Sequence, residues 1–230
     1  MGLCNSPDIF QEKMSELMAD LGFVRTYIDE LLVITSSSFE DHLEKLEQTL
    51  TRLQTAGLKV NISKIKFAKT ELEYLGYYLT RKGTRPLNKK VSAINNLDMP
   101  KNRKGLRKFI GMVNYYRDLF PKRSETLAPL RALTSKTVRW KWTEVHTKAF
   151  EDMKQLVARE TMLSYPDFNK EFHIHTDASA IQLGAVISQD GKPIAFYSRK
   201  LTPAPIRYTT TERVLFSIVE TLKESRTILL

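Results

Sequence analysis

The sequence predicts an α+β fold, in which helices and short antiparallel strands occupy separate stretches of the chain. Three observations support this prediction. Amphipathic helical patterns recur along the chain, the stretches 23–35 and 58–82 are rich in β-forming residues, and a distinct run of strands and a helix follows residue 170. With 230 residues, the chain is long enough for one large or two small domains.

The N-terminal part predicts a helix, a β-hairpin and a second helix. Apolar residues at helical spacing predict the first helix over 7–21. The stretch 23–35 splits at Asp29 and Glu30, which predicts a hairpin with both acids at its tip and strands buried on at least one side. The second helix is expected to begin at a Ser38 cap and to carry an apolar stripe made of Phe39, Leu43, Leu46, Leu50 and Leu53.

The middle of the chain predicts short strands followed by helices. Residues 58–82 alternate and predict three or four strands, with Gly76 and Gly83 marking a close approach and a turn. Gly105 is expected inside a helix, where glycine costs roughly 1 kcal/mol relative to alanine. Residues 121–142 are expected to be irregular. The helices of this part are expected near 88–97, 102–119 and 143–159.

A change of texture near 160–170 marks the expected start of a C-terminal unit. The stretch "EFHIHTDASAIQLGAVISQDGKPIAFYSRKL" predicts three strands, and its Asp-Gly pair predicts a tight turn between the second and third. The remaining residues predict a helix with an apolar face made of Leu215, Ile218, Val219 and Leu222.

Positive charge is concentrated in one segment of the chain. The net charge is +10, and residues 81–139 hold 16 lysines and arginines against three acids, a net charge of +13. Such a block, interleaved with aromatic residues, is typical of a polyanion-binding surface, although a solvated basic surface is the simpler alternative. Charge alone does not separate a nucleic acid from an acidic membrane. The aromatic residues are Phe109, Tyr115, Tyr116, Phe120, Trp140 and Trp142.

Cysteine usage and hydropathy disfavour secretion and membrane insertion. Cys4 is the single cysteine, so no intrachain disulfide can form, which fits a reducing compartment. No apolar run approaches membrane-spanning length, and the first residues show no secretory leader pattern. We therefore expect no membrane partner.

Two acidic patterns are candidates for metal binding. Turns favour Asp in any case, but Asp29 and Glu30 on a rigid hairpin would also suit Mg²⁺, which prefers one or two protein carboxylates plus phosphate oxygens. In "EFHIHTDAS", His173, His175 and Asp177 share one polar face of a strand. A transition-metal cluster there is a weaker alternative, because no cysteine or further histidine lies nearby.

The order of these motifs resembles that of a known family. "TYIDELLVIT" resembles the Tyr-x-Asp-Asp hairpin of reverse transcriptases, "MGLCNSP" the stretch that precedes it, and "GLKVNISKIKF" the segment with the motif lysine. "LEYLGYYLTRKG" is similar to the primer-grip hairpin, and "LRKFIGMVNYYRDLFP" to the thumb helix of gypsy-like LTR retrotransposons. "HTDASAIQLGAVISQ", "PIAFYSRKLT" and "YTTTERVLFSIV" resemble the first part of the attached ribonuclease H domain. The resemblance covers essentially the whole chain.

The resemblance implies four parts and the activities of the family. These are the C-terminal half of a palm, made of β-hairpins and helices, over 1–85, a helical thumb over 86–140, a connection over 141–170, and a truncated ribonuclease H-like α/β domain over 171–230. The family's activities are RNA-directed DNA polymerisation and cleavage of RNA in an RNA–DNA hybrid. The implied partners are an RNA template, a DNA primer, their hybrid and a dNTP, together with the remaining polymerase segments or a second chain.

For polymerisation, the resemblance implies roles position by position. Asp29 would be a catalytic metal ligand, and Glu30 occupies the position of the family's second aspartate. Lys64 matches the lysine that assists the pyrophosphate leaving group, and Tyr27 would lie near the primer terminus. The residues near the template and the incoming nucleotide would be Gly2, Asn5 and Pro7.

Further roles fall on the thumb and the C-terminal unit. In the ribonuclease H-like part, Asp177 and Glu212 would be the first two acidic metal ligands. The cofactor implied at both sites is Mg²⁺, with Mn²⁺ as a substitute, and the implied location is intracellular, in the cytoplasm within a virus-like particle or in the nucleus. The residues expected to contact the primer and the duplex are Leu75, Gly76, Tyr77, Lys104, Arg107 and Lys108.

Departures from the family pattern limit the expected activity. A further essential aspartate of the polymerase family precedes "MGLCNSP", and two further acids of the ribonuclease H family are expected beyond Leu230. One or two carboxylates do not organise two Mg²⁺ ions. We therefore expect the 230 residues alone to be inactive, and the alternative function is nucleic-acid binding through the basic segment 81–139.

Overall fold

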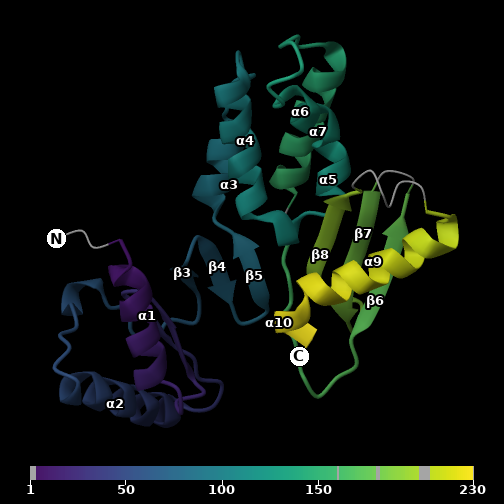
Figure 1. Ribbon diagram of the computed structural model, residues 1–230. Helices are drawn as coiled ribbons and strands as arrows, with labels where there is room; N and C mark the ends of the chain where they lie inside the picture. The colour runs from purple at the N-terminus through teal and green to yellow at the C-terminus, as the bar shows by residue number, and fades with distance from the viewer. Residues whose placement is uncertain (1–3, 160, 180–181, 202–207, 230) are drawn as a thin grey trace. The chain divides into compact units, whose positions relative to one another are not determined.

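The computed structural model describes residues 4–159, 161–179, 182–201 and 208–229. It divides into two compact units, Met1–Lys69 and Thr70–Leu230. Both units contain helices and antiparallel sheet, so the predicted α+β class is confirmed (Figure 1). No helix within the described ranges is both long and apolar enough to cross a membrane.

The first unit packs two helices around a β-hairpin. Its elements are α1 (Ser6–Leu17), β1 (Val24–Tyr27), β2 (Glu30–Val33), α2 (Phe39–Thr55) and a 3₁₀ turn (Ile62–Lys64). The Ser38 hydroxyl accepts from the Asp41 N–H at 3.2 Å, which confirms the predicted cap. The buried core of the unit is small and consists of Met14, Met18, Leu21, Val24 and Leu53.

One expectation for the first unit is confirmed and two are wrong. One side of the hairpin packs on the small core, with Val24 buried and Leu31 and Val33 half-buried, as expected. Most of the apolar stripe of α2 is exposed, including Phe39, Leu43 and Leu50. The first helix ends at Leu17, earlier than expected.

The segment between α2 and the next sheet is not a strand. The Asn61 side chain accepts from the Ser63 N–H at 3.2 Å and from its hydroxyl at 2.7 Å. Such local side-chain bonds compete with strand pairing and favour a tight turn. The expected strand at "LKVNISKIKF" is therefore replaced by the 3₁₀ turn, and Ile62 is 83% exposed.

The second unit begins with a three-stranded meander and continues with helices. The meander consists of β3 (Leu72–Tyr74), β4 (Tyr77–Thr80) and β5 (Gly83–Pro86), in that order. The helices are α3 (Asn88–Asn95), α4 (Arg103–Tyr115), η2 (Arg117–Leu119), α5 (Arg123–Thr126), α6 (Ala128–Leu133) and α7 (Glu144–Ala158). The stretch expected to be irregular thus contains α5 and α6, which pack as short helices against the same core.

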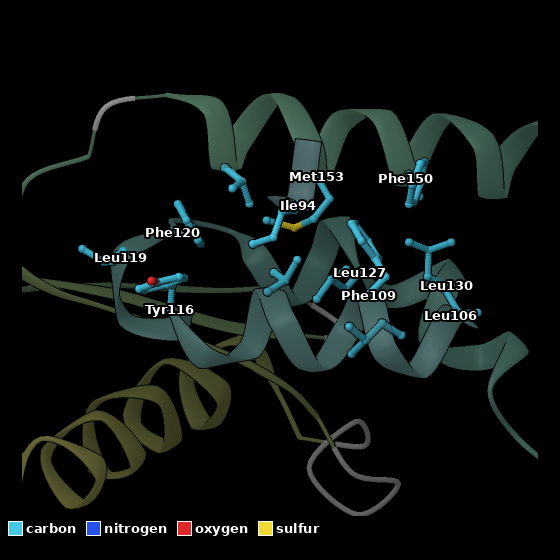
Figure 2. Close-up of a cluster of buried hydrophobic side chains, with 14 of the residues drawn as sticks. Ile94, Leu106, Phe109, Tyr116, Leu119, Phe120, Leu127, Leu130, Phe150 and Met153 are labelled. Carbon is cyan, nitrogen blue, oxygen red and sulfur yellow. The ribbon is translucent and has the colours of Figure 1, made fainter. Parts of the chain in front are cut away.

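One hydrophobic core joins α3, α4, α6 and α7 (Figure 2). Leu106, Phe109 and Val113 come from one face of α4, and Phe150 and Met153 face them from α7. The Phe109 and Phe150 rings lie 4.5 Å apart between centroids. This core fixes which face of α4 points outward, since a helix with one apolar stripe must bury that stripe.

The C-terminal part is a three-stranded antiparallel sheet covered by a helix. The strands are β6 (His173–Ala178), β7 (Gln182–Gln189) and β8 (Lys192–Lys200), followed by α9 (Thr210–Glu224) and α10 (Arg226–Leu229). The predicted Asp190–Gly191 turn is confirmed, with φ of 50° and 73°. Figure 1 shows α9 lying across the sheet, where it packs on β6 and β7.

The helix α9 turns its polar side to the sheet. Ser217 and Thr221 are fully buried, and the Ser217 hydroxyl donates to the Gly184 carbonyl at 3.4 Å. Small side chains allow this close approach of helix and strand. The predicted apolar face is consequently exposed and consists of Leu215, Ile218, Val219 and Leu222.

Two glycines have different structural roles. Gly83 has a φ of 150°, and a Cβ added there would lie 2.0 Å from the Leu163 carbonyl oxygen. This close approach allows Thr84 and Leu163 to exchange backbone hydrogen bonds of 2.8 and 2.9 Å, so Gly83 is required by the path of the chain. Gly105 lies in the first turn of α4, not in its interior, where its N–H is capped by the Asn102 side chain at 2.9 Å.

The substitution Gly83→Ala is expected to destabilise the second unit by about 1–3 kcal/mol, because the new methyl group overpacks against backbone. Gly105→Ala is the matched control, since its Cβ would have only ordinary contacts at 3.7 Å or more. It should leave stability unchanged or raise it by up to about 1 kcal/mol. Urea unfolding of both variants measures the difference, and equal effects would contradict this role of Gly83.

Candidate functional site

The acidic hairpin is held by a glutamine from α1. Its two-residue turn is Ile28–Asp29, while Glu30 is the first residue of β2 and pairs with Tyr27, so only one of the acids lies at the tip. Ile28 has a φ of 50°, a conformation that is rare for a β-branched residue and costs about 1–3 kcal/mol. The Ile28 N–H donates to the Gln11 side-chain oxygen, and the Gln11 amide donates to the Thr26 carbonyl at 3.3 Å.

The hairpin presents its carboxylates to solvent. Asp29 and Glu30 are exposed, and within the described ranges neither carboxylate has a hydrogen bond or ion pair. Across those ranges, no three His, Cys, Asp or Glu side chains come together as a metal site. Two adjacent carboxylates therefore fit part of a Mg²⁺ site and do not complete one.

The other predicted residues of the first unit lie at its surface. Asn5 precedes α1 without a side-chain cap bond, and Pro7 lies in the first turn. Lys64 ends the exposed 3₁₀ turn, and Tyr27 is 51% exposed. Among described residues, no hydrogen bond or ion pair joins Lys64 to the hairpin. Gly2 lies outside the described residues.

A cluster of tyrosines holds the turn at Leu75–Gly76. Leu75 and Gly76 have φ of 44° and 76°, which makes a tight β3–β4 turn. The Tyr115 hydroxyl donates to the Leu75 carbonyl at 2.7 Å, and the Tyr116 hydroxyl donates to the Gly76 carbonyl at 2.6 Å. Tyr77 donates in turn to the Tyr115 carbonyl at 3.2 Å. The C-terminal end of α4 thus fixes both turn carbonyls.

The Tyr115 side chain packs directly against Gly76. A Cβ added at Gly76 would lie 2.3 Å from the Tyr115 hydroxyl oxygen. The Tyr77 and Tyr115 rings stack with centroids 5.9 Å apart, and Tyr116 meets both rings edge-on. The predicted close approach at Gly76 is confirmed, and an aromatic ring occupies it.

The outward face of α4 is basic. Lys104, Arg107 and Lys108 are exposed at spacings of three and four residues, opposite the buried apolar face. Arg107 also donates to the Thr134 carbonyl at 2.8 Å, which fixes its side chain along the surface. The expectation that aromatics interleave with this charge is wrong for three of them, because Phe109, Tyr116 and Phe120 are core residues.

The two candidate acidic residues of the C-terminal part, β6 to α10, have different surroundings. Asp177 is exposed on β6 on the same face as His173 and His175, and it pairs with Gly184 of β7. Glu212 lies in the first turn of α9 and accepts from the Thr209 N–H at 2.7 Å and the Thr209 hydroxyl at 2.9 Å. These hydrogen bonds lower the pKa of Glu212 and give it a capping role.

Comparison with sequence families defines the class of protein. Residues 1–79 match the family "Reverse transcriptase (RNA-dependent DNA polymerase)", and residues 142–230 match the "RNase H-like domain found in reverse transcriptase". The acidic hairpin lies in the first match, and Asp177 and Glu212 lie in the second. The chain therefore belongs to the reverse transcriptases with an RNase H-like domain.

Individual relatives narrow this class. The chain is 34% identical over 232 aligned positions to the Transposon Tf2-3 and Tf2-4 polyproteins of Schizosaccharomyces pombe, which covers 98% of this chain. It spans 17% of the length of these curated relatives. The chain carries the reverse transcriptase and RNase H-like segments of an LTR-retrotransposon polyprotein of the gypsy type.

Solved structures share the fold. A foamy viral protease-reverse transcriptase in complex with RNA/DNA hybrid matches with a TM-score of 0.88 and 25% identity, covering 100% of this chain and 32% of that chain. The same protein in complex with dsDNA matches with a TM-score of 0.86 and 26% identity, covering 100% of this chain and 49% of that chain.

Two positioning features escaped the sequence analysis. Gln11 was assigned only to a helix, and nothing in its local pattern indicates that it bonds to a turn 17 residues away. Tyr115 and Tyr116 were assigned to a basic, aromatic surface. The sequence could have indicated their role. A glycine expected at a close approach needs another group to pack against it, and two adjacent tyrosines at the end of a helix can be that group.

Replacing the tyrosine hydroxyls tests how the turn is held. Tyr115→Phe and Tyr116→Phe should each destabilise the second unit by about 0.5–1.5 kcal/mol, because each leaves a turn carbonyl without its donor. Tyr208→Phe is the control, since Tyr208 is 39% exposed and its hydroxyl has no hydrogen bond among described residues. Thermal unfolding measures the effect, and a loss as large in the control would contradict the role of these hydroxyls.

Alkaline pH tests the environment of Tyr77. Burial raises the pKa of Tyr77 to about 12, whereas its unperturbed pKa is 10.0. The folded state therefore holds the Tyr77 proton more tightly than the unfolded state does. As pH rises from 10 through 12, the unfolded state loses this proton first, so the free energy of unfolding falls over that range. The stability difference between wild type and Tyr77→Phe should shrink across that range relative to neutral pH. A stability difference between the two proteins that does not change with pH would contradict the raised pKa of Tyr77.

Proposed function

We propose that this segment holds the primer–template duplex during RNA-directed DNA polymerisation. The observation that carries the proposal is the two-sided packing of α4, with an apolar face in the core and Lys104, Arg107 and Lys108 outside. Exposed cations at fixed spacing on a rigid helix suit phosphate-backbone contacts, which position a duplex without reading its sequence. The foamy viral relatives in complex with dsDNA and RNA/DNA hybrid support this choice of partner.

The turn at Leu75–Gly76 is proposed to contact the primer end. Its carbonyls are committed to Tyr115 and Tyr116, so the backbone of the turn is stiff and connected directly to the helix that holds the duplex. Stiffness is valuable here because a misplacement of about 1 Å can cost roughly 10²-fold in rate.

The acidic hairpin is proposed to supply two ligands of the polymerase metal site. Asp29 would bind Mg²⁺ directly, and Glu30 would do so with a side chain one methylene longer than aspartate. When bound, two such ions stabilise the attacking and leaving oxygens of nucleotidyl transfer. Tyr27 would lie by the primer terminus, Lys64 by the leaving pyrophosphate, and the incoming dNTP by the segment with Gly2, Asn5 and Pro7.

The RNase H-like part is proposed to contribute Asp177 to cleavage of the RNA strand in the hybrid. Glu212 would join it as a second metal ligand only by giving up its hydrogen bonds to Thr209. Because neither acidic site brings three ligands together within the described residues, we propose that the 230 residues bind duplex but do not catalyse alone.

Salt dependence tests the duplex-binding face. Replacing Lys104, Arg107 and Lys108 by Ala should weaken hybrid binding and lower the slope of log affinity against log salt by about 1 for each phosphate that these side chains no longer neutralise. The matched control removes three other exposed lysines, Lys136, Lys141 and Lys148, and should change the slope less. Fluorescence anisotropy over a salt series measures both, and equal slopes in the two variants would contradict the assignment to α4.

Primer extension tests the incomplete metal site. On an RNA template with a DNA primer and Mg²⁺ or Mn²⁺, the 230-residue chain should give no product, since one or two carboxylates do not hold two ions. Extension that Asp29→Ala abolishes would contradict the proposal. In a longer, active form of the protein, Glu30→Asp should raise the rate, because the shorter side chain restores the carboxylate position of the family; equal rates would contradict this.

A further inference from the structure

A polar cavity lies between the α4–α6 region and strand β8 of the second unit. Its volume is about 340 Å³, at the lower end of the range of roughly 300–1,000 Å³ typical of ligand sites. Five of its lining side chains are cationic and two are anionic, an excess of three positive charges. The cations are Arg117, Arg123, Arg131, Arg199 and Lys200, and the anions are Asp118 and Glu224.

Some of these cations already have acidic partners. Arg117 lies 3.0 Å from Glu224 and 3.5 Å from Asp118, and Arg199 is paired with Glu220. Arg123, Arg131 and Lys200 have no carboxylate partner within 4.0 Å in the part of the chain that the structure describes. The cations of the cavity that lack an acidic partner are therefore these three side chains.

Arg123 is the most informative of the three. It is 7% exposed, its Nε has no hydrogen-bond partner among the described residues, and its Nη1 donates to Asn114. A buried guanidinium without a carboxylate partner is costly, because its hydration is lost and the single hydrogen bond to Asn114 replaces only part of it. Burial lowers the pKa of Arg123 to about 10, so the group is still charged at neutral pH.

The neighbouring groups hold the two arginines side by side. Arg131 donates to the same Asn114 oxygen at 3.2 Å and to the Ser124 hydroxyl at 3.4 Å. The Ser124 N–H donates to the Ser198 hydroxyl at 2.9 Å, and Gln182 donates to it at 3.1 Å. Ser198, which also lines the cavity, keeps its own O–H available to donate.

We propose that this cavity binds a phosphate oxyanion between Arg123, Arg131 and Lys200. The planar guanidinium fork matches the oxygens of a phosphate, and two such forks with a lysine supply the opposite charge that the buried Arg123 lacks. The phosphate belongs either to a free anion or to the backbone of a bound nucleic-acid strand. The chemistry of recognition is the same for both sources, and it does not depend on polymerase activity.

Titration with inorganic phosphate tests the proposal. One phosphate should bind per chain with saturation, and the Nε–H resonance of Arg123 should shift in the NMR spectrum, with chloride at equal ionic strength as the reference. Arg131→Gln should weaken binding about tenfold, as expected for loss of a charge-assisted hydrogen bond. Asp118→Asn should strengthen it, because it removes a negative charge from the lining.

The control variant removes the same positive charge from a position outside the cavity. Arg139→Gln removes an exposed arginine that does not line the cavity and should leave phosphate affinity unchanged. Arg123→Lys keeps the charge but loses the planar guanidinium, and should weaken phosphate binding. No saturable binding up to about 10 mM, or equal affinity in Arg131→Gln and Arg139→Gln, overturns the proposal.

Competition then identifies the source of the phosphate. If it is a backbone phosphate, an RNA–DNA hybrid displaces inorganic phosphate, and Arg131→Gln weakens hybrid binding more than Arg139→Gln does. If it is a free anion, hybrid and phosphate bind together, and Arg131→Gln leaves hybrid affinity unchanged. Either result supports the proposal, since both require the cavity to bind phosphate.

Discussion

The second unit depends on the burial of one face of α4. Leu106, Phe109 and Val113 pack against α7 in a core that also includes α3 and α6. Burying these side chains fixes the rotation of the helix about its axis, and this rotation determines which side chains face the solvent. The basic residues point outward, and the two tyrosines at the C-terminal end reach the Leu75–Gly76 turn. The proposed duplex-binding surface and the turn proposed to contact the primer are thereby both attached to one rigid helix.

The acidic hairpin is built on a weaker scaffold. Its two strands pack on a small core from one side only, and its turn places Ile28 in a left-handed conformation that Gln11 stabilises through a backbone N–H. Strained turns persist where surrounding contacts over-determine them, and they are common at functional sites. The strain of this turn therefore agrees with the proposed role of the hairpin in presenting Asp29.

The sequence predicted local structure better than packing. Caps, glycines and hairpin turns follow from a few adjacent residues, so the Ser38 cap, the Asp190–Gly191 turn and the close approach at Gly76 could all be predicted. Phe109 and Phe120 were misjudged, because burial depends on which helix lies opposite, and sequence spacing does not give that. The segment 58–67 failed for another reason, since the Asn61 side chain bonds locally and competes with strand pairing.

The central claim is that a nucleic-acid duplex lies against the outer face of α4, and site-directed cross-linking tests it most directly. With Cys4 replaced by Ser, single cysteines at Lys104 or Lys108 can be offered to an RNA–DNA hybrid that carries a backbone-tethered thiol. Both positions should form disulfide cross-links in high yield, and Glu151→Cys on the exposed side of α7 should not. Equal yields at all three positions, or cross-linking at Glu151→Cys alone, would contradict the account.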